Sequence, residues 1–173
     1  MTRAVGIDVG GTKALGVVLD ESGNVLAEDR RPTPRGPGST SRLIETLAEL
    51  AESLGPYDHL GVGVPGLVTY DGVLRAAPNL DGVADLDVAG LLGERIGRPV
   101  QVDNDATCAT VSEWLYGAGR GSTDMVLVTL GTGIGGGLVI GGRVQRGKHG
   151  FTGEFGHMVV NPDGPPCPCG RRG

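Results

Sequence analysis

Two glycine-rich stretches carry the residues whose types and spacing could bind phosphate. The first is Asp8-Val9-Gly10-Gly11-Thr12-Lys13, and the second is Gly131-Thr132-Gly133-Ile134-Gly135-Gly136-Gly137. Because glycine has no Cβ, successive backbone N–H groups in such a stretch can converge on an anion. Thr12, Lys13 and Thr132 add hydroxyl and ammonium donors. The pair therefore indicates a phosphate clamp, whereas either stretch alone is also compatible with an ordinary hairpin turn.

The setting of these stretches separates them from two common nucleotide motifs. Gly131, Gly133 and Gly136 fit G-x-G-x-x-G, but that fingerprint must open a helix. An apolar run, a Gly-Gly turn and a second apolar run follow instead, which predicts strand, tight turn and strand. The sequence contains no G-x-x-x-x-G-K-[ST], which argues against a P-loop NTPase. The same order of strand, glycine stretch, strand, turn and strand occurs near residue 1, so the chain contains a weak internal repeat.

Composition and charge limit the class of protein. Glycine supplies 33 of 173 residues without a G-X-Y period, as in a turn-rich globular chain. This length permits one domain or one and a fraction. A net charge of −5, with no basic face, gives no electrostatic reason to expect nucleic acid or an anionic membrane as a partner. No apolar run is long enough to span a bilayer and the start leads directly into a strand, so we expect a cytoplasmic protein.

Helix and strand patterns alternate between the two glycine stretches. Ser39 or Thr40 could cap a helix with a 3.6-residue apolar period, and Arg31 to Gly38 is interpreted as a surface loop. The further elements are a strand at 60–64, an extended pair at 67–70 and 73–76, a helix at 85–96, a strand at 100–102 and a helix at 106–116. A strand-rich start, then alternation, then a second strand-rich start predicts a duplicated α/β domain with a cleft between its halves.

A strand gives way to a helix at Asp103-Asn104-Asp105, a position where ligands commonly bind in α/β sheets. Asn104 or Asp105 could simply cap that helix. A carboxylate there would also stay ionised, because a helix N-terminus favours negative charge, and could accept a proton from a substrate hydroxyl. The two roles do not exclude one another.

The C-terminal residues form a separate group. His157 precedes Cys167-Pro168-Cys169 and could converge with both thiols on one metal ion. Thiols spaced C-x-C are poorly placed to bond each other, so zinc is favoured over a disulfide, although two reduced cysteines in a loop remain an alternative. Three ligands are one fewer than a structural zinc site uses. Cys108, inside the third expected helix, is predicted to be a small core residue.

Further short motifs accompany the two glycine stretches. They are Gly63-Val-Pro-Gly66, Pro78-Asn79-Leu80, Asn104-Asp105-Ala106 and Gly153-Glu-Phe-Gly-His157, followed by the cysteine-rich tail Cys167-Pro-Cys-Gly-Arg-Arg-Gly173. Taken together, these motifs resemble the ROK family of bacterial sugar kinases and repressors, and within it the glucokinases most closely. The resemblance extends over the whole chain, and its most specific part is the Gly153–His157 motif with the cysteine-rich tail.

The resemblance implies a role for each matching residue. Asp105 would be the catalytic base for the sugar 6-hydroxyl, and Asp8 would position Mg²⁺. His157 would both bind sugar and, with Cys167 and Cys169, ligate a structural Zn²⁺. The remaining sugar-binding residues would be Gly66, Asn79, Asn104 and Glu154, with Asp105 among them. The residues around the phosphates of ATP would be Gly10, Gly11, Thr12, Lys13, Gly131, Thr132 and Gly133.

The fold that the resemblance implies is α/β: a duplicated actin-like, ribonuclease H-like sugar-kinase fold. We expect a complete first domain at 1–105, with the first phosphate loop and the catalytic Asp105. A partial second domain at 106–173 would carry the second phosphate loop and the zinc-binding loop. The family pattern places a third zinc-ligating cysteine after Gly173, so we expect a partial chain and describe the mechanism for the parent protein.

The implied function is ATP-dependent phosphorylation of glucose at its 6-hydroxyl by a dimer or tetramer. Alternatives within the family are another acceptor, such as an N-acetylhexosamine or fructose, and polyphosphate as donor. A sugar-sensing ROK repressor is a further alternative, but its helix-turn-helix would precede a chain that here starts in the first strand. A non-catalytic zinc module is the remaining alternative.

Overall fold

The protein divides into two compact units, Met1–Asp105 and Ala106–Gly173. The structure, a computed structural model, describes residues 2–131, 133–167 and 169–173. Among these residues, no helix combines the length and the apolar character that crossing a membrane requires. Each unit is built around its own sheet, and each sheet contains one of the glycine stretches.

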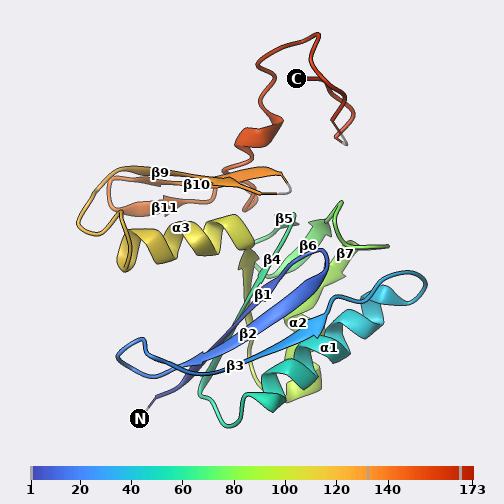
Figure 1. The fold of residues 1–173 in the computed structure, drawn as a ribbon, viewed down its shortest axis with the longest axis vertical. Coiled ribbons are helices and arrows are strands. Elements are labelled where there is room, and N and C mark those ends of the chain that lie inside the picture. The colour runs from blue at the N-terminus through green and yellow to red at the C-terminus, as the bar shows by residue number, and fades with distance from the viewer. Residues whose placement is uncertain (1, 132, 168) are drawn as a thin grey trace. The chain divides into compact units, whose positions relative to one another are not determined.

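The first unit contains a five-stranded sheet in the order β3-β2-β1-β4-β8. Figure 1 labels β1, β2, β3 and β4 of this sheet. Three antiparallel strands begin it, and β4 and β8 then pair in parallel beyond β1. Because β1, β4 and β8 are parallel, their carboxyl ends lie at the same end of the sheet, the place where ligands commonly bind in α/β sheets. The strands are β1 (Ala4–Val9), β2 (Lys13–Leu19), β3 (Val25–Pro32), β4 (His59–Val64) and β8 (Gln101–Asn104).

The core of the first unit lies between this sheet and helix α1 (Ser39–Ser53). Alternate residues of β1 and β2 are buried on the face that α1 covers. Gly16 lies at the closest approach, since a Cβ there would be 2.8 Å from Cδ1 of Leu54 and 3.1 Å from Cγ of Leu50. The helix can therefore pack closely on the sheet because Gly16 has no side chain at this point.

Two details of the predicted helices in the first unit are wrong. The N-cap of α1 is Gly38, and the hydroxyl of Ser39 donates to the carbonyl of Asp81 at 2.5 Å instead of capping. The expected helix at 85–96 begins later, because residues 84–87 form β7 (Ala84–Asp87) before α2 (Val88–Ile96). The side chain of Asp87 caps α2 by accepting from the amide of Gly90 at 2.8 Å. A small sheet in the order β5-β6-β7 is completed by β5 (Leu67–Val68) and β6 (Val73–Ala76).

The second unit contains the three-stranded antiparallel sheet β11-β10-β9. Helix α3 (Asp105–Leu115) begins at the last residue of the first unit, and its Thr110 packs where Gly137 leaves space. The short helix η1 (Phe155–His157) packs on β10. Cys108 is exposed, so its predicted burial is wrong; α3 buries Ala106, Thr107 and Thr110 instead. The strands are β9 (Met125–Leu130), β10 (Ile134–Ile140) and β11 (Arg143–Gln145).

Candidate functional site

The first glycine stretch forms the turn between β1 and β2. The amide of Gly10 donates to the carbonyl of Lys13 at 2.8 Å and closes the turn. Gly11 packs closely on another segment, since a Cβ there would lie 3.3 Å from the carbonyl oxygen of Asn79. The structure thus brings a predicted phosphate-binding residue against a predicted sugar-binding residue within the first unit.

Asp8 lies at the end of β1, in a row of residues across the sheet edge. It is in register with Gly63 of β4, which is in register with Asp103 of β8. Although Asp8 is exposed, the protein atoms around its carboxylate displace water and raise its pKa, and the positive charge of Lys13 partly opposes this rise. An exposed carboxylate beside a glycine turn offers the oxygen atoms that Mg²⁺ prefers, so Asp8 fits one ligand position of that ion.

Gly66, Asn104 and Asp105 also lie together in the first unit. The side-chain amide of Asn104 donates to the carbonyl of Gly66 at 3.0 Å. Gly66 has φ of 117°, and a Cβ there would overlap the carbonyl oxygen of Ala76, so the chain requires glycine at this position. Asp105 is the first residue of α3 and follows Asn104 directly. The carboxylate therefore lies at a helix N-terminus, beside an asparagine that is fixed to the Gly66 loop.

The second glycine stretch forms the turn between β9 and β10 in the second unit. The amide of Gly131 donates to the carbonyl of Gly133 at 3.0 Å. Thr132, the predicted hydroxyl donor of this loop, lies outside the described residues.

His157, Cys167 and Cys169 form one cluster in the second unit. One ligand atom from each residue lies within 4.8 Å of the others, and Nδ1 of His157 is 3.5 Å from Sγ of Cys167. A hydrogen bond from the Arg171 backbone, with further bonds from Cys167 and His157, lowers the pKa of Cys169 to about 7. An imidazole and two thiols, one of them readily ionised, are the donor set that zinc prefers, so these residues fit three positions of a zinc site.

Glu154 lies on the other side of the same imidazole. Its Oε2 is 3.6 Å from Nε2 of His157, and it directly precedes η1. A carboxylate beside the second nitrogen of a metal-binding histidine fixes the tautomer and the orientation of the ring. The two predicted sugar-binding residues of this unit are therefore adjacent to each other and to the thiols.

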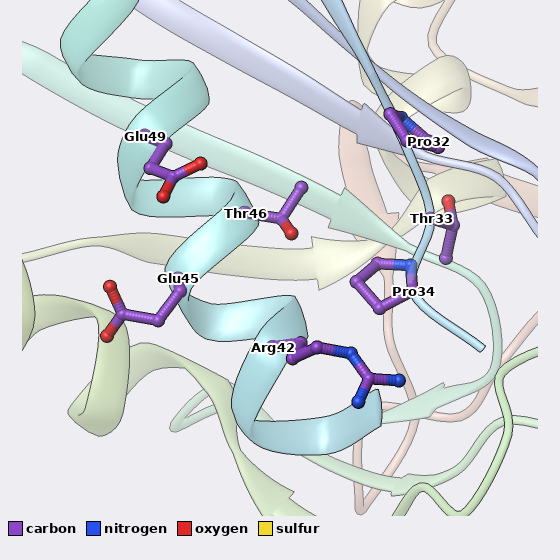
Figure 2. A pocket seen from close by; sticks show the side chains of 7 residues that line it. All are labelled: Pro32, Thr33, Pro34, Arg42, Glu45, Thr46 and Glu49. Atoms are coloured by element: carbon purple, nitrogen blue, oxygen red, sulfur yellow. The ribbon is translucent and has the colours of Figure 1, made fainter. Parts of the chain in front are cut away.

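A shallow depression of about 340 Å³ on the first unit contains none of the predicted site residues. Figure 2 shows its wall, formed by α1 on one side and the segment after β3 on the other. Two of its charged groups are engaged with neighbours: Arg42 donates to two backbone carbonyls, and Glu45 pairs with Arg95 at 2.9 Å. The lining residues are Pro32, Thr33, Pro34, Arg42, Glu45, Thr46 and Glu49.

Two residues near this depression contact the first glycine turn and were missed by the sequence analysis. Thr33 is buried and bonds to Gly10, and Arg35 bonds to Gly11. Composition predicts a surface loop from Arg31 to Gly38, which is wrong at its start, because Arg31 and Pro32 belong to β3 and Thr33 is buried. The β2–β3 hairpin could have indicated this contact, because the pairing of Lys13 with Pro32 places Thr33 beside the glycine turn.

Comparison with known proteins supports one family over the whole chain. The ROK family model matches residues 4–173. The glucokinase of Streptomyces coelicolor is 37% identical over 174 residues, which cover 100% of this chain and 55% of that protein. The xylose repressor of Bacillus subtilis is 32% identical over 98% of this chain and 46% of its own length. The chain thus spans about half the length of the curated relatives it matches.

A solved structure gives the same result for the fold. The crystal structure of a ROK family glucokinase from Streptomyces griseus, in complex with glucose and AMPPNP, matches with a TM-score of 0.89 and 36% identity. The match covers 99% of this chain and 55% of that one. This confirms the predicted α/β, actin-like sugar-kinase fold, of which the chain contains one part. The chain belongs to the ROK family.

Proposed function

We propose that the protein carrying this chain is a kinase that transfers a phosphoryl group from ATP to the 6-hydroxyl of glucose. The main support is the similarity to the Streptomyces griseus glucokinase, whose structure contains glucose and AMPPNP and matches 99% of this chain. A cytoplasmic location and a dimeric or tetrameric assembly belong to the same proposal.

Asp105 is proposed as the catalytic base on the sugar side. Its position at the start of α3 favours the ionised carboxylate, which can accept the proton of the 6-hydroxyl. The hydrogen bond from the side-chain amide of Asn104 to the carbonyl of Gly66 fixes the orientation of that amide beside Asp105. Gly66 is proposed to form part of the wall of the sugar pocket. The remaining sugar-binding residues are proposed to be Asn79, Glu154 and His157.

The first glycine turn is proposed to hold the phosphates of ATP. The amide of Gly10 is used within the turn, so the phosphate contacts are assigned to Gly11, Thr12 and Lys13. Asp8 would hold Mg²⁺, which neutralises phosphate charge when bound. Gly131, Thr132 and Gly133 are assigned the corresponding contacts from the second unit. This arrangement supplies positioning and charge neutralisation, the two things that phosphoryl transfer requires.

The chemical step follows from these assignments. The oxygen of the 6-hydroxyl attacks the γ-phosphorus while its proton passes to the carboxylate of Asp105. The bond from the γ-phosphorus to the β,γ-bridging oxygen breaks, and ADP leaves. No covalent intermediate with the protein is needed. Zinc bound by His157, Cys167 and Cys169 is assigned a structural role, in which it would fix the loop that carries Glu154.

The test is a coupled assay of the native polypeptide that carries this chain, across hexoses and with ATP or polyphosphate as donor. Asp105→Asn keeps the shape and removes the base, so we expect kcat to fall by roughly 10²- to 10⁴-fold while glucose binding, measured by calorimetry, is retained. Asp87→Asn is the matched control, because Asp87 also lies at a helix N-terminus and Asn can still cap that helix. Turnover retained by Asp105→Asn would contradict the assignment.

A repressor is the second candidate, and the similarity to the xylose repressor is the observation that favours it. Sugar binding without phosphoryl transfer, together with binding of operator DNA, would support this candidate over the kinase. Transfer to an N-acetylhexosamine or to fructose in preference to glucose, or from polyphosphate in preference to ATP, would keep the kinase and change its substrates.

A further inference from the structure

The segment at residues 33–39, which we call the brace, contacts the first glycine turn from the side of β3. The hydroxyl of Thr33 donates to the carbonyl of Gly10 at 2.7 Å, and its amide donates to the carbonyl of Thr12 at 3.0 Å. Nη2 of Arg35 donates to the carbonyl of Gly11 at 2.6 Å. Together with the bond from Gly10 to Lys13, all the carbonyls from Gly10 to Lys13 are accepting hydrogen bonds inside the first unit.

This pattern matters because carbonyl and amide groups have opposite effects on an anion. A backbone N–H attracts phosphate, whereas a carbonyl oxygen repels it. A glycine-rich turn can rotate its peptide planes easily, so its sequence alone does not decide which group faces a ligand. Hydrogen bonds to four consecutive carbonyls remove that freedom and leave the amide side for the ligand.

The brace is itself fixed at several points. Arg42 donates to the carbonyls of Arg35 and Pro37, each at 2.6 Å. Gly36 donates its amide to the carboxylate of Asp81 at 2.9 Å, and Ser39 donates to the carbonyl of the same residue. Thr33 is only 7% exposed and lies on the wall of the depression in Figure 2. The brace is therefore held between α1 and the segment that follows Asn79.

We propose that Thr33 and Arg35 are positioning residues for the nucleotide: they hold the carbonyls of the first glycine turn away from the phosphates. The inference rests on the proposed use of this turn for ATP. Neither residue is assigned a contact with the ligand, and both act through the backbone of Gly10, Gly11 and Thr12. Their loss should therefore weaken nucleotide binding without changing the affinity for sugar.

Thr33→Val is the main variant, because it removes the hydroxyl and keeps the shape. In the native polypeptide we expect the KM for ATP and the Kd for Mg-ADP, measured by calorimetry, to rise roughly three- to tenfold, the range one hydrogen bond supplies. The KM for glucose should not change. Thr33→Ser restores the donor and should restore nucleotide affinity. Arg35→Ala changes an exposed residue, so folding is not at risk, and it should shift the same two constants in the same direction.

Ser53→Ala is the structural control. Its hydroxyl lies 2.7 Å from Oδ2 of Asp29 and 2.8 Å from the carbonyl oxygen of Leu50, so it can donate to either; the contact with Asp29 joins α1 to β3 away from the glycine turn. A loss of nucleotide affinity in Ser53→Ala equal to that in Thr33→Val would assign the effect to general stability and overturn the proposal. Unchanged nucleotide affinity in both Thr33→Val and Arg35→Ala would also overturn it.

The outcomes separate this inference from the proposed function. If the wild type binds Mg-ADP but phosphorylates no sugar, the kinase proposal fails, while the selective loss in Thr33→Val would still support the brace. If phosphoryl transfer is normal and Thr33→Val has no effect, the kinase proposal stands and the brace is wrong. If the wild type does not bind Mg-ADP, both are wrong.

Discussion

The two sheets share one hairpin pairing but differ in what covers them. In the first unit Ile7 is paired with Gly16, and Ile7 lies two residues before Val9, the last residue of β1. In the second unit Val128 is paired with Gly136 at the same place before its turn. The pairs that close the turns, Val9 with Ala14 and Leu130 with Ile134, also correspond.

Burial separates these equivalent positions. Val5, Ile7 and Val9 are 2%, 2% and 0% exposed, whereas Val126, Val128 and Leu130 are 62%, 51% and 81% exposed. Helix α1 covers the first set, since Leu50 and Leu54 lie over Gly16. On the second sheet the ring of Phe155 lies over Gly136 and α3 packs on the opposite face.

The difference shows that hairpin pairing and core formation are separate properties of this sequence. The strand alternation and the glycine turn determine the register, because a shift by one residue would reverse every side chain. Whether the apolar side chains become core depends on a helix that comes later in the chain. Substitutions at equivalent positions should therefore have unequal effects in the two units.

The largest difference is expected for a charge at the equivalent positions Ile7 and Val128. Ile7→Asp buries an unpaired carboxylate and should lower the free energy of unfolding of the first unit by about 4 kcal/mol or more. Val128→Asp places its charge in water and should cost less than about 1 kcal/mol. Denaturant unfolding monitored by hydrogen exchange resolves the two units. An equal loss at both positions would show that the exposed face of the second sheet is covered in solution.

Metal removal should affect the second unit alone. We expect zinc to bind His157, Cys167 and Cys169, and its chelation to lower the stability of the second unit by about 3 kcal/mol while the first unit is unchanged. The fluorescence of Trp114, the one tryptophan, reports on the second unit, because its indole donates to the carbonyl of Ser122 at 2.8 Å.

Two variants give the control for metal removal. Cys167→Ser should abolish metal binding, measured by elemental analysis and by the thiolate absorption of bound cobalt. Cys108→Ser changes an exposed thiol outside the cluster and should leave the metal content unchanged. A metal content that Cys167→Ser does not alter would rule out this cluster as the site.

Much of this comparison could be predicted from sequence because its signals are local. Alternating apolar residues on either side of a glycine stretch predict each hairpin, and the internal repeat predicts that the second resembles the first. The positions of Asp8 and Asp105 at element ends follow from the same local patterns. The fold class that the family resemblance implied is confirmed by the structural match.

The wrong or missing predictions involve partners far away in the chain. The sequence predicts Ser39 or Thr40 as the cap of α1, but the N-cap is Gly38 and the hydroxyl of Ser39 bonds to Asp81, 42 residues away. Thr33 bonds to Gly10 across 23 residues, and composition alone placed it in a surface loop. The contact of Gly11 with Asn79 is likewise tertiary. Local pattern cannot identify such contacts, because they depend on how the sheet and the helices pack.

A smaller difference is expected at the equivalent glycines Gly16 and Gly136. Gly16→Ala would push mainly against leucine side chains, which can shift, so we expect a loss of about 1 kcal/mol. Gly136→Ala would overlap the carbonyl oxygen of Leu127 and the ring of Phe155, and backbone cannot shift easily, so about 3 kcal/mol is expected.

Thermal unfolding with Trp114 fluorescence for the second unit and hydrogen exchange for the first measures both glycine variants. Gly61→Ala is the control, since a Cβ there meets nothing within 4 Å, and it should be close to neutral. A larger loss for Gly16→Ala than for Gly136→Ala would mean that α1 holds its sheet more rigidly than the strand pairing does.

The smallest effect is a pH dependence at the first glycine turn. Loss of water raises the pKa of Asp8 above its ordinary value of 3.8, so ionisation of this group opposes folding. Below the pKa that Asp8 has in the unfolded chain, the carboxyl is protonated in both states and costs no stability. As the pH rises from there through the pKa of the folded state, ionisation of Asp8 lowers the free energy of unfolding. Asp8→Asn removes the charge, and it should therefore be more stable than the wild type near neutral pH and equal to it in acid.

Asp20→Asn is the control with the opposite sign. Hydrogen bonds from the side chain and backbone of Asn24, with smaller ones from Ser22 and Gly23, lower the pKa of Asp20. Its stabilisation is present above the unfolded pKa and is lost as pH falls through the folded pKa, so Asp20→Asn should be less stable than the wild type near neutral pH. Melting temperatures at neutral and acid pH measure both variants. If Asp8→Asn also behaves like Asp20→Asn, the carboxylate of Asp8 supports the fold. The expected opposite signs would show that the ionised carboxylate of Asp8 lowers stability, as is common for a residue kept for function.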